Sequence, residues 1–110
     1  MEILFKSEKL RRNCEDINKA IIEWGPRIAR KLIQRLNELS AAECLEHIPH
    51  VPPTRRHALQ NKRKGQFAVD ILHPFRLVFQ PILDDGTILI NTELSQITRV
   101  KILEVVDYHE

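Results

Sequence analysis

The sequence predicts an α+β fold, in which helices pack on one face of a small, twisted and mainly antiparallel sheet. Between residues 8 and 39, apolar residues recur at three- and four-residue steps, which is typical of amphipathic helices. After residue 66 they alternate with polar residues, which is typical of strands. A strand, two or three helices and then three or more strands give a layered arrangement. The length of 110 residues is that of a single domain, spanning 1–110.

The composition is that of an ordinary soluble globular protein, with 43% hydrophobic and 29% charged residues. The longest apolar runs are too short to cross a bilayer, so we expect no membrane partner and a cytoplasmic location. The net charge is only +2, but positive residues gather at 27–35 and 55–64, so any nucleic-acid footprint is expected to be local. Cys14 and Cys44 fall at apolar positions of helical patterns, which predicts buried free thiols.

The first half of the chain predicts a short strand followed by a helical hairpin. Glu2–Phe5 is a β-like run, and Gly25-Pro26 separates the two helices, with proline at a first helical position. The apolar stripe of the first helix consists of Leu10, Cys14, Ile17, Ile21 and Trp24. That of the second consists of Ile28, Leu32, Leu36 and Leu39. The basic residues of the second helix are expected to form a solvated face: Arg27, Arg30, Lys31 and Arg35.

The segment after this hairpin predicts a third, short helix. The residues Ser40-Ala41-Ala42-Glu43 have the spacing of a capping box, and the helix is expected to run through Cys44 to about His47. Prolines then indicate an extended loop.

The second half predicts a β-hairpin whose register follows from burial. Two apolar sets alternate along it, one made of Phe67, Val69 and Ile71 and the other of Phe75, Leu77 and Phe79. A three-residue turn places both sets toward the helices. Arg76 then falls on the opposite, open face, together with Gln66, Ala68 and Asp70.

The end of the chain predicts a turn at 84–86, a short strand at 87–90 and a loose helical turn that contains Leu94, Ile97 and Val100. Residues 102–108 are apolar on both faces, as in a strand inside a sheet.

The motifs of phosphate-binding glycine loops, zinc sites and serine hydrolases are absent from the sequence, so we predict neither a cofactor nor a metal. The candidate catalytic residues are His57, Arg76, Asp107, Tyr108 and His109. Histidine can act as acid or base near neutral pH, and arginine can stabilise a phosphorane. The basic loop beside them supplies candidate RNA-binding residues, namely Arg55, Arg56, Lys62, Arg63, Lys64 and Gln66. These residue types suit metal-free cleavage of RNA.

Each candidate also has a purely structural interpretation. His57 fits an ordinary surface histidine, Arg76 fits a partner of Asp70, and residues 107–109 lie where chains commonly fray. His47, His50 and His73 are interpreted as loop residues. On these patterns alone, the chain is a small α+β protein with a basic edge that binds nucleic acid.

Four motifs together resemble the RelE/ParE superfamily of bacterial toxins, and specifically its HigB-type branch, also described as plasmid maintenance killer proteins. They are RHAL at 56–59, KRKGQFAV at 62–69, FRLVF at 75–79 and VVDYH at 105–109, and the resemblance covers almost the whole chain. It implies a RelE-like fold and a ribosome-dependent endoribonuclease that cuts mRNA and is inhibited by a helix-turn-helix, HigA-like antitoxin.

The resemblance also implies roles for single residues. His57 would lie near the scissile phosphate and Arg76 would stabilise the transition state, while Asp107 and His109 would complete the site with Tyr108 between them. Lys62, Arg63 and Lys64 would hold RNA. The chain departs from the family pattern at Gln60-Asn61 and in the long segment 84–99. An inactive RNA- or protein-binding member, and a ParE-like inhibitor that binds DNA gyrase, therefore remain as alternatives.

Overall fold

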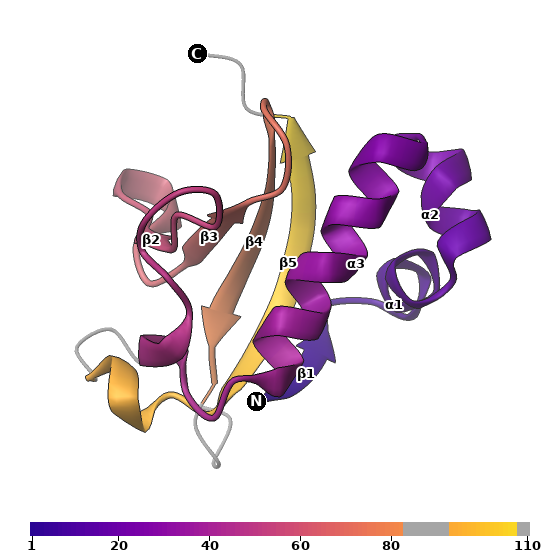
Figure 1. The fold of residues 1–110 in the computed structure, drawn as a ribbon. Helices are drawn as coiled ribbons and strands as arrows, with labels where there is room; N and C mark the ends of the chain where they lie inside the picture. The colour runs from indigo at the N-terminus through magenta and orange to yellow at the C-terminus, as the bar shows by residue number, and fades with distance from the viewer. Residues whose placement is uncertain (83–92, 108–110) are drawn as a thin grey trace.

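The structure is a computed structural model that describes residues 1–82 and 93–107. The three α-helices of these residues lie together on one side of the sheet (Figure 1), so the predicted α+β architecture is confirmed. In chain order the helices and strands are β1 (Glu2–Phe5), α1 (Glu8–Glu15), α2 (Ile17–Trp24), α3 (Pro26–Ala41), β2 (His57–Ala58), β3 (Phe67–Asp70), β4 (Phe75–Pro81) and β5 (Arg99–Asp107). Short 3₁₀ helices cover Leu45–His47, Asn61–Arg63 and Leu94–Gln96.

The five strands form one sheet in the order β1-β5-β4-β3-β2. Strand β1 is parallel to β5, and the other pairs are antiparallel. The last strand lies inside the sheet as predicted, but it begins at Arg99 and therefore includes Val100, which the sequence assigned to a helical turn. The predicted turn at 84–86, the predicted strand at 87–90 and Tyr108 lie outside the described residues.

The first predicted helix is in fact two helices, because Asp16 interrupts it. The Asp16 backbone is extended, and its carboxylate accepts hydrogen bonds from the backbone N–H groups of Asn18 and Lys19 at 2.9 and 3.4 Å. Aspartate is a strong N-cap, so a new helix starts there with a new rotational phase. Ala20 is consequently fully buried, whereas Ile17, expected in the core, is 39% exposed.

Helix α3 begins as predicted after Gly25, whose φ of +84° suits glycine, and Pro26 occupies its first turn. Two predictions about its surroundings are wrong. The capping box does not form, because the helix continues through Ala41 and only a 3₁₀ turn follows at Leu45–His47. Arg35 does not point to solvent, since its side chain is 1% exposed against the sheet.

The register of the β3–β4 hairpin is the predicted one. Phe67 pairs with Phe79 and Val69 with Leu77, and the Ile71 N–H donates to the Phe75 carbonyl at 3.0 Å across a three-residue turn. These side chains belong to the core beneath the helices, which also contains Cys14. Cys14 and Cys44 are both buried and free, as predicted.

The opposite face of the sheet is only partly open, which corrects the prediction. Ala68 and Val78 are fully buried there beneath Leu59, which is 8% exposed. Ala68 is small, so the chain that follows β2 can pack closely over it.

A β-bulge extends this second cluster along β5. Val78 pairs with Glu104 but the next residue, Phe79, pairs with Ile102, so Leu103 is an extra residue in β5. Leu103 and Val106 both pack against the second cluster, while Ile102 belongs to the core under the helices. The bulge thus changes which residues of β5 face the helices.

Candidate active site

His57 lies on β2 and faces the side of the sheet away from the helices. Its partner in the register is Ala68, and residues that pair directly across antiparallel strands share a face. Its ring Nδ1 is 2.6 Å from the backbone carbonyl oxygen of Arg55. A carbonyl oxygen only accepts, so Nδ1 carries the proton and, in the neutral ring, Nε2 has the free lone pair. This contact fixes His57 in the tautomer of a base acting through Nε2.

Arg76 lies on β4 directly opposite Asp70 of β3, on the same face as His57. The Asp70 carboxylate lies between two guanidinium groups. Its Oδ1 is 3.5 Å from Nε of Arg76, and its Oδ2 is 3.3 Å from Nε of Arg55. All three side chains line a polar cavity of about 60 Å³ at the hairpin end, with His73 and Pro74. The structural interpretation of Arg76 as a partner of Asp70 is thus confirmed, and Arg55 is an additional partner.

The positions of His57 and Arg76 relative to each other follow from the register. His57, Ala68 and Val78 form one row across the sheet, and Asp70 and Arg76 form the next row. Strand and residue spacings then place the Cα atoms of His57 and Arg76 about 12 Å apart. The two residues therefore share one face, near enough for their side chains to contact one nucleotide.

The terminal group of candidates is only partly described. Asp107 is exposed at the end of β5 and pairs with Phe75, so the register places it on the helix side, unlike Arg76. Tyr108 and His109 lie outside the described residues. The predicted convergence of the terminal residues on Arg76 thus stays a prediction.

Besides Arg55, which is paired with Asp70, two of the predicted RNA-binding cations have contacts within the protein. Nη1 of Arg56 lies 3.0, 3.1 and 2.8 Å from the carbonyl oxygens of Leu45, Glu46 and Ile48, so this side chain fixes the 3₁₀ turn beneath it. Arg63 forms an ion pair with Glu104 and donates to Gln66 at 3.1 Å.

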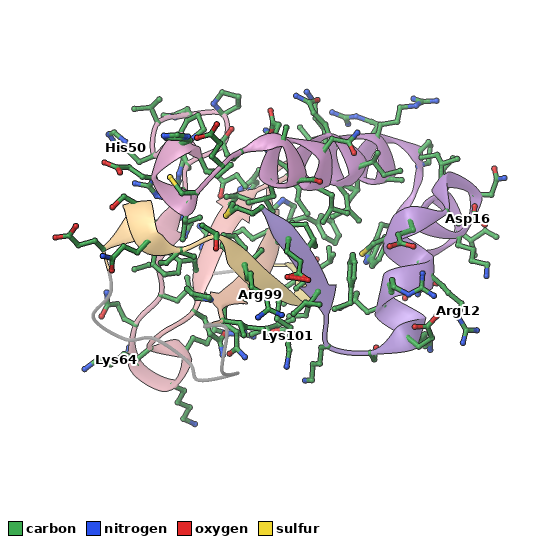
Figure 2. The ribbon with its side chains drawn as sticks, turned by 90° about the horizontal axis from the view of Figure 1, so that it is seen from below. Arg12, Asp16, His50, Lys64, Arg99 and Lys101 are labelled. Atoms are coloured by element: carbon green, nitrogen blue, oxygen red, sulfur yellow. The ribbon has the colours of Figure 1, made fainter. Side chains whose placement is uncertain are left out.

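Lys62 and Lys64 are exposed beside them. Figure 2 shows Lys64 projecting from the end of the molecule opposite Arg12 and Asp16. Of the predicted loop cations, Lys62 and Lys64 are thus the most exposed, whereas Arg55 is half-buried and paired with Asp70.

Arg35 supports this site from the other side of the sheet, and the sequence interpretation missed it. Its Nε donates to the backbone carbonyl of Asp70 at 2.7 Å, and its Nη1 donates to Glu38 at 3.0 Å. The helix layer therefore holds the residue that lies between Arg55 and Arg76. The sequence did contain a signal for its burial, because position 35 falls on the apolar stripe of the helix, three residues after Leu32.

Within residues 1–82 and 93–107, no group of three or more His, Cys, Asp or Glu side chains is arranged to hold a metal ion. In the same part of the chain, every helix is too short or too polar to cross a membrane.

Comparison with known proteins identifies the fold. No protein-family model and no curated protein matches the sequence. Among solved structures, a YoeB/ParE toxin from Agrobacterium tumefaciens aligns with a TM-score of 0.58 and 11% identity, covering 99% of this chain and 100% of that one. A YoeB dimer from Staphylococcus aureus aligns with a TM-score of 0.56 and 19% identity, covering 100% and 98%.

A heterotetrameric YoeB-YefM toxin-antitoxin complex, also from Staphylococcus aureus, aligns with a TM-score of 0.55 and 15% identity, covering 100% and 98%. At such identities the likeness concerns the fold, and the HigB-type branch stays a prediction. The chain has the fold of the YoeB/ParE toxins.

Proposed function

We propose that this chain is the toxin of a type II toxin–antitoxin system and cleaves mRNA on the ribosome, without a metal ion. The observation that carries the proposal is the placement of His57 and Arg76 on one face of the sheet, with Arg55 beside Arg76. The fold shared with YoeB/ParE toxins supports the toxin assignment, and the YoeB-YefM complex supports an antitoxin partner, for which we propose a helix-turn-helix protein.

In the proposed reaction, Nε2 of His57 removes the proton from a ribose 2′-hydroxyl, and the resulting oxygen attacks the adjacent phosphorus. The guanidinium of Arg76 stabilises the negative charge that develops on the phosphorane oxygens. The bond to the 5′-oxygen then breaks, and this oxygen takes a proton from His109, which the resemblance assigns to the site together with Asp107. Lys62 and Lys64 bind flanking phosphates.

A second candidate is a ParE-like inhibitor that binds DNA gyrase and cuts nothing. The specific observation in its favour is Asp70, whose carboxylate offsets the positive charge of the two arginines beside it. An arginine held by a carboxylate can serve a protein interface as well as an active site.

Induced expression distinguishes the two candidates. We expect growth arrest with the wild-type chain and loss of arrest with His57→Ala, with Arg76→Ala and on removal of residues 107–110. His50→Ala is the matched control for the first variant, since His50 is an exposed loop residue. Arrest that survives all three changes would overturn the nuclease proposal and favour gyrase binding.

Primer extension on induced cells tests the reaction itself. We expect new 5′ ends within a translated message. The same message with its start codon removed should stay intact, because cutting is proposed to need the ribosome. Cutting of both messages alike would contradict the ribosome dependence, although it would leave RNA cleavage in place.

A further inference from the structure

One cavity of the molecule lies outside the proposed catalytic face. It has a volume of about 330 Å³ and lies between the α2–α3 corner and the β3–β4 turn. These two corners lie at the same end of the molecule in Figure 1. The walls include Trp24, Pro26, Arg27, Ile28, Leu72 and His73.

This cavity, which we call the Trp24 cavity, is adjacent to the polar cavity at Arg76, where the scissile phosphate is proposed to bind. His73 lines both the Trp24 cavity and the smaller polar cavity that contains Arg55, Asp70 and Arg76. A strand of RNA whose backbone contacts Arg76 can therefore pass over the hairpin turn and reach the Trp24 cavity.

The lining combines two kinds of chemistry. A half-buried indole and the apolar side chains of Ile28 and Leu72 form the walls, and the exposed cationic or titratable groups of Arg27 and His73 lie beside them. Aromatic walls stack on bases, and cations bind the phosphates that flank a base. The volume is at the lower end of the range for small-ligand sites. This combination fits one unstacked base on an anionic backbone better than an uncharged apolar ligand.

We propose that the Trp24 cavity binds a nucleobase of the single-stranded RNA whose scissile phosphate lies at Arg76. This inference rests on the proposed function for the identity of the strand. It assigns to Trp24 the stacking of a base next to the cut site, and to Arg27 and His73 contacts with the flanking backbone.

The experiment uses Trp24 as its own probe, because it is the single tryptophan of the sequence. The ligand is a 2′-O-methyl RNA hexamer, which lacks the attacking hydroxyl and stays intact. We expect it to quench the fluorescence of Trp24. An abasic hexamer with the same number of phosphates should bind about tenfold more weakly and leave the fluorescence nearly unchanged, as expected when one stacked base is lost.

Surface variants test the flanking contacts without disturbing the core. Arg27→Ala and His73→Ala remove exposed side chains of the cavity, and each should weaken the quenching titration severalfold. Arg30→Ala, which removes an exposed arginine of α3 that does not line the cavity, should leave it unchanged. Equal quenching by the base-bearing and abasic hexamers, or no quenching by either, would overturn the inference.

Failure here is distinguishable from failure of the proposed function. Cutting that depends on His57 and Arg76, without base-dependent quenching, would leave the nuclease proposal standing and overturn the base site. Base-dependent quenching in a chain that never cuts RNA would support the base site and overturn the nuclease.

Discussion

The backbone carbonyl of Asp70 accepts a 2.7 Å hydrogen bond from Nε of Arg35, which reaches it from helix α3. The carboxylate of the same aspartate lies on the other face, between Arg55 and Arg76. One residue of β3 thus connects the helix layer to the candidate site. Disturbing Arg35 should consequently affect both the stability of the fold and the geometry of the site.

Arg35→Ala is expected to lower the free energy of unfolding by about 2–4 kcal/mol, because it removes a charge-assisted hydrogen bond and leaves a cavity beneath α3. Urea denaturation measures this change. Arg30→Ala removes an exposed arginine of the same helix and should change the value by no more than about 0.5 kcal/mol. Arg35→Met keeps most of the side-chain volume, so its loss in the free energy of unfolding should lie between those of Arg35→Ala and Arg30→Ala. Equal effects of Arg35→Ala and Arg30→Ala would show that the buried contact stabilises nothing.

Asp70→Asn removes a negative charge from between two guanidinium groups while keeping the shape of the side chain. At low salt we expect single-stranded RNA to bind about threefold more tightly, the effect of one unit charge at roughly 6 Å in water. Cleavage should slow, because Arg76 loses a carboxylate that positions it. Binding titrations at several salt concentrations, together with single-turnover cleavage on ribosomes, separate the two effects. Glu43→Gln gives the same change of charge at an exposed position, and a matching gain in that variant would argue against a local effect.

Asp16→Ala should destabilise the chain by about 1 kcal/mol, because the first N–H groups of α2 lose their side-chain acceptor. Asp16→Asn preserves an acceptor oxygen and should retain most of the stability. Urea denaturation followed by circular dichroism compares the two variants. If alanine and asparagine behave alike, the carboxylate contacts are not what starts the second helix.

Burial raises the pKa of the Cys14 thiol from 9.0 to about 12, with a smaller contribution from the charge of Glu15. In a Cys44→Ser variant at pH 8, iodoacetamide should therefore modify native Cys14 at least about tenfold more slowly than a thiol of ordinary pKa, because little thiolate forms. Denaturant should restore the ordinary rate. Rapid modification of the native protein would contradict the burial.

The same shift has a consequence for stability in alkaline solution. The pKa of Cys14 is raised in the folded state. The stability gained by burying its neutral thiol is therefore fully present below pH 9 and is lost as the pH rises toward 12. Denaturation at pH 8 and pH 10 should show a lower free energy of unfolding at the higher pH in the Cys44→Ser background. Cys14→Ala, which cannot ionise, should lose less over this interval.

The sequence was sufficient to predict the fold where the alternation of side chains and their burial agree. The apolar sets of β3 and β4 determined the turn length, and the turn length determined that Arg76 lies away from the helices. It was insufficient where one polar residue has two possible roles. The apolar stripe predicts one helix across Asp16, although this residue caps a second helix, and arginine usually lies in solvent, although Arg35 is buried here.

The site was predictable only in part, for a related reason. Residue types identified His57 and Arg76, and the register brings them to one face. Arg56 donates hydrogen bonds to backbone carbonyls, and Arg63 forms an ion pair with Glu104. These contacts depend on how distant parts of the chain pack, which charge patterns along the sequence do not reveal.

The extra residue in β5 shows how a strand can accommodate one more residue while the pairs on both sides of it stay formed. Leu103 shifts the alternation of everything that follows it in the strand, so that Val105 packs under the helices and Val106 packs on the far side. Val78 pairs with Glu104 and Phe79 with Ile102, so a chain without Leu103 could keep all the other pairs between β4 and β5 in one regular ladder. Such a deletion would remove one side chain from the second cluster and straighten the strand, and it would leave Val105, Val106 and Asp107 on the faces that they occupy now.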